Sequence, residues 1–163
     1  MIEKKLILKQ ARKNKEVVYG SQSIKKHIGF HARQPNDFDI MAKNPRASAK
    51  QIERKLDRKA RSDDYYVKPS KHEGTFKVKH KGWDGEKGTK DDLEIADYSK
   101  MRNIQTQKID GVRYANLSET IKDKTRSLKN KDFKHRHSKD REDLERIRFA
   151  KQTQSMNKRF KNG

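Results

Sequence analysis

Two short apolar segments constrain the fold of this chain more than any other feature. Val17-Val18-Tyr19 is a β-branched and aromatic run that stops at Gly20-Ser21, as a buried strand does where a helix begins. Residues 37–40, Asp-Phe-Asp-Ile, alternate carboxylates with apolar side chains. Because successive side chains of a strand point to opposite faces, the two aspartates share one face while the Phe and Ile face the interior.

The paired acids, Asp37 and Asp39, indicate a metal site. Two carboxylates on one strand face repel each other unless a cation lies between them. This arrangement holds Mg²⁺ against the phosphates of a nucleotide. Gly20 has no Cβ and allows a ligand to approach the backbone, and the helix that follows Ser21 offers free N–H groups and a positive dipole end. The sequence therefore predicts a nucleoside triphosphate and Mg²⁺ at this point.

A third carboxylate on an adjacent strand would complete a two-metal site. In the predicted strand 93–98, Leu-Glu-Ile-Ala-Asp-Tyr, both Glu94 and Asp97 are candidates. Because the two residues are three positions apart, they point to opposite faces of a regular strand, so we expect only one of them to face the site.

Hydrophobic periodicity predicts an α+β (mixed α/β) fold, in which helices back a small mixed sheet and a C-terminal helical extension follows. We expect Ser21 to cap the second helix, Asn116 and Glu119 to form a capping box, and Ser138 to cap a last helix with a fraying tail from Gln152. Residues 1–110 are predicted to form the catalytic core and residues 111–163 the helical part. Helices are expected from residue 2 to about 13, between Ser21 and Gly29, after Asn44-Pro45, from 117 to about 128, and after Ser138. The expected strands span 16–19, 37–41, 65–67, 75–79 and 93–98.

The charge of the chain points to a polyanionic partner, with nucleic acid as the first candidate. Lys and Arg outnumber Asp and Glu by 43 to 23, for a formal net charge of +20. Residues 1–62 carry a net +11 and residues 118–163 a net +8. If these two parts lie on either side of a cleft, the cleft is expected to be electropositive.

Composition also excludes several classes of protein. The chain has no cysteine, so disulfides, thiolate catalysis and Cys-ligated zinc are excluded. No apolar run approaches the length of a membrane span, and the basic N-terminal segment lacks the apolar core of a signal peptide. We therefore expect no membrane partner and a cytoplasmic location.

The order of these motifs resembles a known superfamily. Gly20-Ser21, Asp37-Phe38-Asp39 and a later strand acid are similar to the pattern of the DNA polymerase β-like nucleotidyltransferases. A second resemblance is to the C-terminal helices of the AbiEii-type nucleotidyltransferases, a group that includes toxins that add nucleotides to tRNA ends. The residues that carry this second resemblance are Leu117–Leu128 with Lys124, Arg136, Lys139-Asp140 and Asp143-Leu144.

The resemblance implies roles for individual residues. Gly20 and Ser21 would contact the terminal phosphates of the nucleotide, and Asp37 and Asp39 would bind Mg²⁺. Asp97 fits the third acid best, because Ala96-Asp97-Tyr98-Ser99 is similar to the strand of the family. From the helical part, Lys124 would reach a phosphate, and Lys139, Asp140 and Asp143 would line or brace the far side of the cleft.

The implied activity is Mg²⁺-dependent transfer of a nucleoside monophosphate from an NTP to a hydroxyl of an acceptor. The charge favours RNA as the acceptor, with the 3′ end of tRNA as one such acceptor, and a protein or a small molecule is an alternative. A different class of function is a non-catalytic RNA- or DNA-binding protein whose carboxylates are structural.

Overall fold

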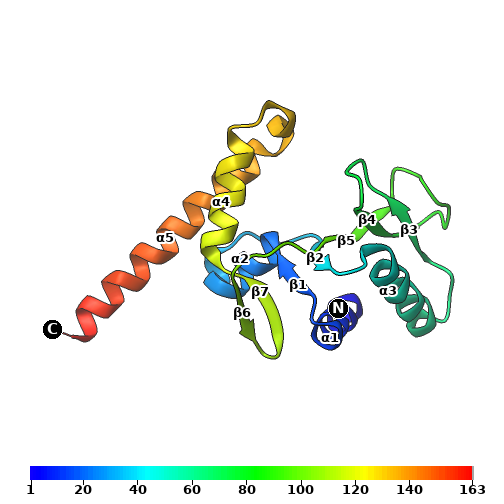
Figure 1. The fold of residues 1–163 in the computed structure, drawn as a ribbon, viewed down its shortest axis with the longest axis horizontal. Coiled ribbons are helices and arrows are strands. Elements are labelled where there is room, and N and C mark those ends of the chain that lie inside the picture. The colour runs from blue at the N-terminus through cyan, green and yellow to red at the C-terminus, as the bar shows by residue number, and fades with distance from the viewer. Residues whose placement is uncertain (163) are drawn as a thin grey trace.

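A mixed sheet of seven strands forms the centre of the molecule (Figure 1), in a computed structural model that describes residues 1–162. The strand order is β3-β4-β5-β2-β1-β7-β6. The strands are β1 (Val17–Tyr19), β2 (Phe38–Ala42), β3 (Tyr65–Pro69), β4 (Phe76–His80), β5 (Leu93–Lys100), β6 (Thr106–Ile109) and β7 (Val112–Ala115). The α-helices are α1 (Ile2–Asn14), α2 (Gly20–Ile28), α3 (Pro45–Ala60), α4 (Leu117–Leu128) and α5 (His137–Lys161), with short 3₁₀ segments η1 (Gly29–His31) and η2 (Lys131–Arg136).

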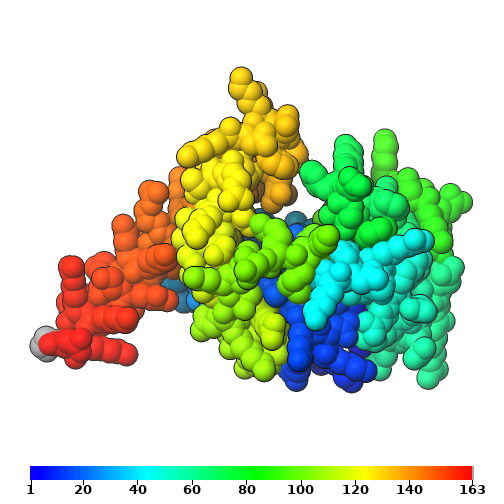
Figure 2. Space-filling view, viewed as in Figure 1, coloured from blue at the N-terminus to red at the C-terminus, as the bar shows by residue number. Residues whose placement is uncertain are grey.

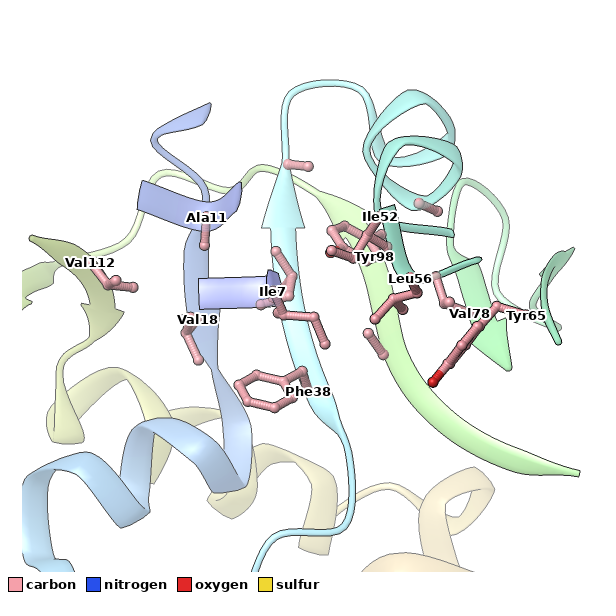
Figure 3. Packing of buried hydrophobic residues seen from close by; sticks show 14 of the residues in the cluster. Ile7, Ala11, Val18, Phe38, Ile52, Leu56, Tyr65, Val78, Tyr98 and Val112 are labelled. Carbon is pink, nitrogen blue, oxygen red and sulfur yellow. The ribbon is translucent and has the colours of Figure 1, made fainter. Parts of the chain in front are cut away.

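The alternating pattern of the central strands decides which face of the sheet is buried. Phe38 and Ile40 on β2, with Ala96 and Tyr98 on β5, are in the main hydrophobic core, and α1 and α3 cover that face (Figure 3). The residues between them on the same strands, including Asp39 and Asp97, consequently point to the opposite face. The α+β fold is thus as predicted.

A second cluster joins the C-terminal helices to α2. Ile24 and Ile28, one turn apart on α2, pack against Ile147 and Ala150 of α5. Figure 1 shows α4 and α5 side by side, with the C-terminal half of α5 extending away from the sheet. No helix of residues 1–162 is long and apolar enough to cross a membrane.

Several local predictions were wrong. The hairpin of β6 and β7 was not predicted, because residues 106–115 carry three charged side chains and a Gly turn that mask the strand pattern. Ser21 lies inside α2, whose first residue is Gly20, and Ser138 lies inside α5. Asn116 precedes α4, as predicted, but no side-chain capping bond forms there. The polar segment after Gln152 continues α5 up to Lys161.

The β6–β7 hairpin also affects the predicted boundary between the catalytic core and the helical part. Its turn contains Asp110 and Gly111, and β7 pairs with β1 in the centre of the sheet. The division into residues 1–110 and 111–163 stays a prediction, and we propose to place the boundary after Ala115 instead, where the sheet ends and α4 begins.

Candidate functional site

Three neighbouring strands bring the predicted glycine and two of the predicted acids together. β1 pairs with β2 so that Tyr19 lies opposite Asp39, and β2 pairs with β5 so that Asp39 lies opposite Asp97. Gly20 follows Tyr19 directly and begins α2. The start of a helix therefore lies against two carboxylates that project from adjacent parallel strands.

The contact between Gly20 and Asp39 requires a glycine. Gly20 has φ of +64°, and a Cβ at this position would lie 2.2 Å from Oδ2 of Asp39. The absence of a side chain lets the first turn of α2 approach the carboxylate closely.

We expect Gly20→Ala to lower both stability and activity. The substitution places a methyl group on Asp39 and imposes a left-handed backbone on an L-residue, which costs about 1–3 kcal/mol. Urea unfolding measures the stability loss, and the nucleotide-transfer assay described below measures the activity. Gly29→Ala is the control, because Gly29 has a similar positive φ of +60° but its Cβ would meet open space. Equal losses in both variants would contradict the steric role of Gly20.

The pKa values of the three acids, Asp37, Asp39 and Asp97, are all raised. Burial, followed by the charges of Asp37 and Asp97, raises the pKa of Asp39 to about 7. Burial is also the largest cause that raises the pKa of Asp37 and of Asp97. Carboxylates whose pKa values are raised by burial and by one another are stabilised by any cation that binds between them.

A cavity of about 380 Å³ opens in front of Asp39 and Asp97. Figure 2 shows the notch above it, between the α4–η2 segment and the β3–β4 turn. His72 of that turn and Phe133 of η2 face each other at the rim with ring centroids 6.2 Å apart. The C-terminal helices therefore form one wall of the site, and the β3–β4 turn forms the opposite wall.

The charges that line this cavity balance, which corrects the expectation of an electropositive cleft. Four cationic and four carboxylate side chains line it. The cations of residues 1–62 are absent from the described lining, because α1 and α3 carry most of them on the other face of the sheet. The charged lining residues are Arg102, Lys124, Arg126, Arg136, Asp39, Asp97, Asp123 and Asp140.

A buried ionic network connects the start of α2 to the C-terminal helices. Arg33 donates to both carboxylate oxygens of Asp143, at 2.7 and 3.2 Å, and to Oγ of Ser21 at 2.6 Å. Nζ of Lys124 lies 2.8 Å from Asp143 and 3.0 Å from Asp140. Two cations and two carboxylates thus neutralise one another, and the hydroxyl proton of Ser21 is left to point elsewhere, since its oxygen already accepts from Arg33.

The hydrogen bonds of this network shift the titration of Asp140. Burial would raise the pKa of its carboxyl group, but the bonds from Ser127 and Lys124 outweigh burial and hold the pKa below the ordinary value. Asp140 therefore stays ionised and keeps the Lys124 ammonium in place.

Not every predicted residue reaches the cavity. Gly20, Asp39, Asp97, Lys124 and Asp140 line it. Among the described residues that line the cavity, Asp37 and Ser21 do not appear, although Asp37 is close enough to raise the pKa of Asp39. Lys139 is exposed on α5 and is also outside the described lining.

Lys77 contacts both candidates for the third acid, in a way that the sequence did not reveal. Its Nζ lies 2.8 Å from Oε1 of Glu94 and 3.4 Å from Oδ2 of Asp97. The β4–β5 register shifts next to Val78, and this irregularity lets both acids reach one lysine. Asp97 is the one in register with Asp39 and lines the cavity.

The carboxylates of Asp37, Asp39 and Asp97 are suitable ligands for a divalent cation, although they are not close enough together to form a complete metal site. Within residues 1–162, no group of three His, Asp or Glu side chains is close enough to hold a metal ion as it stands. Oδ1 of Asp97 is nevertheless buried without a hydrogen-bond partner among the described residues. Carboxylate oxygens are the ligands that Mg²⁺ uses in proteins, so Asp39 and Asp97, with Asp37 beside them, suit this ion.

Sequence reasoning missed the side chains that complete the walls. Arg33 stands in a loop with no periodic pattern, so no local signal indicated its role. Arg102 and Asp123 form an ion pair at 3.0 Å across 21 residues, a pairing that only the fold brings about. Arg136 was part of the quoted resemblance but carried no role, and it lines the cavity.

No family model and no curated protein matches the sequence. Among solved structures, the Megavirus polyadenylate synthase superposes with a TM-score of 0.71 at 18% identity, over 90% of this chain. JHP933 from Helicobacter pylori, and an H. pylori protein that is described as a nucleotidyltransferase, superpose with TM-scores of 0.52 at 15% and 16% identity, over 82% of this chain. The chain has the nucleotidyltransferase fold.

These comparisons confirm the predicted fold, and the match covers only part of each neighbour. The chain spans 30% of the viral protein and 56% and 59% of the two bacterial proteins. None of the three names assigns the chain to the AbiEii-type group, so that assignment stays a prediction, as does a cytoplasmic location.

Proposed function

We propose that the protein is a divalent-metal-dependent nucleotidyltransferase, which transfers a nucleoside monophosphate from an NTP to a hydroxyl group of RNA. The observation that carries this proposal is the juxtaposition of Gly20, at the start of α2, with Asp39 and Asp97 in register on adjacent strands at the base of one cavity. The nucleotidyltransferase fold of the chain supports it.

Each residue has a defined part in this proposal. Asp39 and Asp97 would hold Mg²⁺ with the help of Asp37, and the metal would supply charge neutralisation of the phosphates when bound. The first turn of α2, at Gly20 and Ser21, would donate N–H and O–H groups to phosphate oxygens. Asp97, with one buried unpartnered oxygen, is also placed to accept the proton of the acceptor hydroxyl.

Lys124 is proposed to position the wall of the cavity and not to bind the nucleotide directly. Because Asp140 and Asp143 hold its ammonium, its charge is already neutralised, and it would fix the cavity wall instead of binding a phosphate alone. Arg136 lines the cavity and, in the described chain, forms no ion pair, so it is the cation that we expect to meet phosphate there. Lys139 is not expected to contact nucleotide.

RNA is proposed as the acceptor on two grounds. The net charge of +20 favours a polyanion. One structural neighbour is a polyadenylate synthase, a name that denotes the synthesis of polyadenylate, which is a polymer of nucleotides. The 3′ end of tRNA is a narrower form of the same proposal.

A labelling experiment tests the function. The protein is incubated with MgCl₂, total RNA and each α-³²P-labelled NTP in turn, with and without EDTA. We expect label on RNA with at least one NTP, which EDTA and the Asp39→Asn substitution abolish. Lys139→Ala is the matched control, since this exposed side chain lies outside the described lining of the cavity, and we expect it to label RNA as the unaltered protein does. Label on a protein or on a small molecule would show that the acceptor is that molecule and not RNA.

The second candidate is a non-catalytic RNA- or DNA-binding protein, which the charge of the chain also favours. It predicts RNA binding that depends on salt and needs neither Mg²⁺ nor NTP. Absence of label with every NTP, together with salt-dependent RNA binding, would support this candidate.

A further inference from the structure

The positive charge of the N-terminal part gathers on the face of the sheet opposite Asp39. Helices α1 and α3 lie side by side on that face (Figure 1). Side-chain hydrogen bonds join the two helices: Lys55 donates to Gln10 at 3.0 Å, and Asn14 donates to Gln51 at 2.8 Å. The two helices therefore present one continuous outer surface, which we call the α1–α3 surface.

This surface is strongly basic. The two helices carry eleven Lys or Arg residues and three Asp or Glu residues. Ten of the eleven cationic side chains are exposed, and the exception is the half-buried Lys55. The exposed cations are Lys4, Lys5, Lys9, Arg12 and Lys13 of α1, and Arg46, Lys50, Arg54, Arg58 and Lys59 of α3.

Two of the three acids of these helices are engaged elsewhere, so most of this positive charge has no acidic partner. Glu3 accepts from the hydroxyl group of Tyr65 at 2.9 Å. Asp57 accepts from the backbone N–H groups of residues 64 and 65. Within the described residues, Lys50–Glu53, at 3.0 Å, is the one ion pair that either helix forms.

The cations are also regularly arranged and crowded. Lys5, Lys9 and Lys13 follow one another at every fourth residue of α1, and Lys50, Arg54 and Arg58 do so on α3. Successive members of each row lie about 6 Å apart along the helix. Burial, and then the charges of Lys13 and Lys9, lower the pKa of Lys55, the lysine between the rows. Like charges held this close destabilise a free protein and are relieved when a polyanion binds.

We propose that the α1–α3 surface binds the phosphate backbone of RNA, at a site separate from the catalytic cavity. The choice of RNA as the polyanion rests on the proposed function, whereas the surface itself does not depend on catalysis. Rows of Lys and Arg in which only Lys50 has an acidic partner suit a phosphate backbone without base recognition, because they offer point charges and no fixed base-reading pattern. The surface would hold a part of the RNA that lies away from the reacting end.

Removal of one row tests the proposal. The triple variant Lys5→Gln, Lys9→Gln and Lys13→Gln keeps good helix formers at all three positions. Binding of a fluorescent single-stranded RNA is measured by anisotropy between 50 and 200 mM KCl. We expect weaker binding, and a plot of log Kd against log salt whose slope falls by about 2, since each lost phosphate contact lowers it by about 0.7. Transfer to a dinucleotide acceptor, which is too short to reach the surface, is expected to be unchanged.

Two controls separate this proposal from the proposed function. The triple variant Lys151→Gln, Lys158→Gln and Lys161→Gln removes the same charge from the exposed end of α5, and we expect a smaller change in slope. Asp39→Asn is expected to bind RNA as well as the unaltered protein does, even if transfer fails. An unchanged salt slope in the α1 variant would overturn the proposal, as would equal slopes in the two triple variants, or binding to vesicles of anionic lipid with none to RNA. Absence of transfer in the unaltered protein would overturn only the proposed function.

Discussion

Asp39→Asn is expected to reduce nucleotide transfer by roughly a thousand-fold or more, because it removes a charge on which both the metal and the nucleotide phosphates would depend. Asparagine keeps the size of the side chain, so the close approach of Gly20 is preserved. The measurement is the initial rate with saturating NTP and MgCl₂, compared with that of the unaltered protein. A variant that keeps full activity would exclude Asp39 from the catalytic site.

The same substitution is expected to stabilise the fold at high pH. The carboxyl group of Asp39 titrates near 3.8 in an unfolded chain and at a pKa of about 7 in the folded protein. Ionisation is therefore harder in the folded state, and the unaltered protein loses stability as pH rises between these two values. We expect Asp39→Asn to raise the free energy of unfolding at pH 8 by on the order of 4 kcal/mol, and to change it little at pH 4.

Chemical unfolding in the presence of EDTA checks this pH dependence, because a bound metal would hide it. Lys139→Ala, measured at the same two pH values, provides the control for a general effect of charge. Equal stability changes for Asp39→Asn at pH 4 and pH 8 would show that Asp39 does not titrate as described.

Asp143→Ala is expected to cost about 3–5 kcal/mol of stability, because it leaves buried positive charge without a partner. Asp143 is 1% exposed and binds both Arg33 and Lys124. Its loss frees Arg33 from the bidentate contact and so releases the hydroxyl group of Ser21 from a fixed position. Thermal or urea unfolding measures the cost, and we expect activity to fall even at temperatures where the variant remains folded.

Glu142→Ala is the matched control for Asp143→Ala. Glu142 is the preceding residue on α5, and its exposed ion pair with Arg146 spans one helical turn at 2.9 Å. An exposed pair of this kind contributes about 0.3–0.5 kcal/mol. Similar stability losses for the two variants would mean that the buried network does not hold α5 against α2.

The parts of the fold that the sequence predicted are those in which local pattern and tertiary environment agree. The alternation of residues 37–40 fixed the faces of β2, and the apolar spacing of α3 matched its buried side. The predicted cap at Ser21 was wrong because α2 begins at Gly20, whose close approach to Asp39 is a contact with another strand. The β6–β7 hairpin was not predicted because both strands have only four residues, and the edge strand β6 is mostly polar and largely exposed.

The site shows the same division between local and distant information. Gly20 and Asp39 could be chosen from the residues alone, since each stands at the end or centre of a short apolar run. Asp97 was preferred to Glu94 only through the resemblance to the family strand. Arg33, Arg102 and His72 could not be chosen, because their contribution comes from partners 21 to 110 residues away. The sequence showed the net positive charge but not that the cations of α1 and α3 lie on the face of the sheet away from the cavity. No local pattern shows which face of the sheet a helix will cover.

The parallel pairing of β1 with β7 has a consequence for how the chain folds. Val17 pairs with Arg113, and Val18 with Tyr114, across almost one hundred residues. During synthesis, β1 cannot pair with β7 until residue 115 has been added. One edge of β1 therefore stays unpaired while most of the chain is being made. Contacts this distant in sequence slow folding, and open strand edges favour pairing with other chains. Fragments that end near residue 110 are therefore expected to aggregate on expression, whereas fragments that include Ala115 are expected to close the sheet.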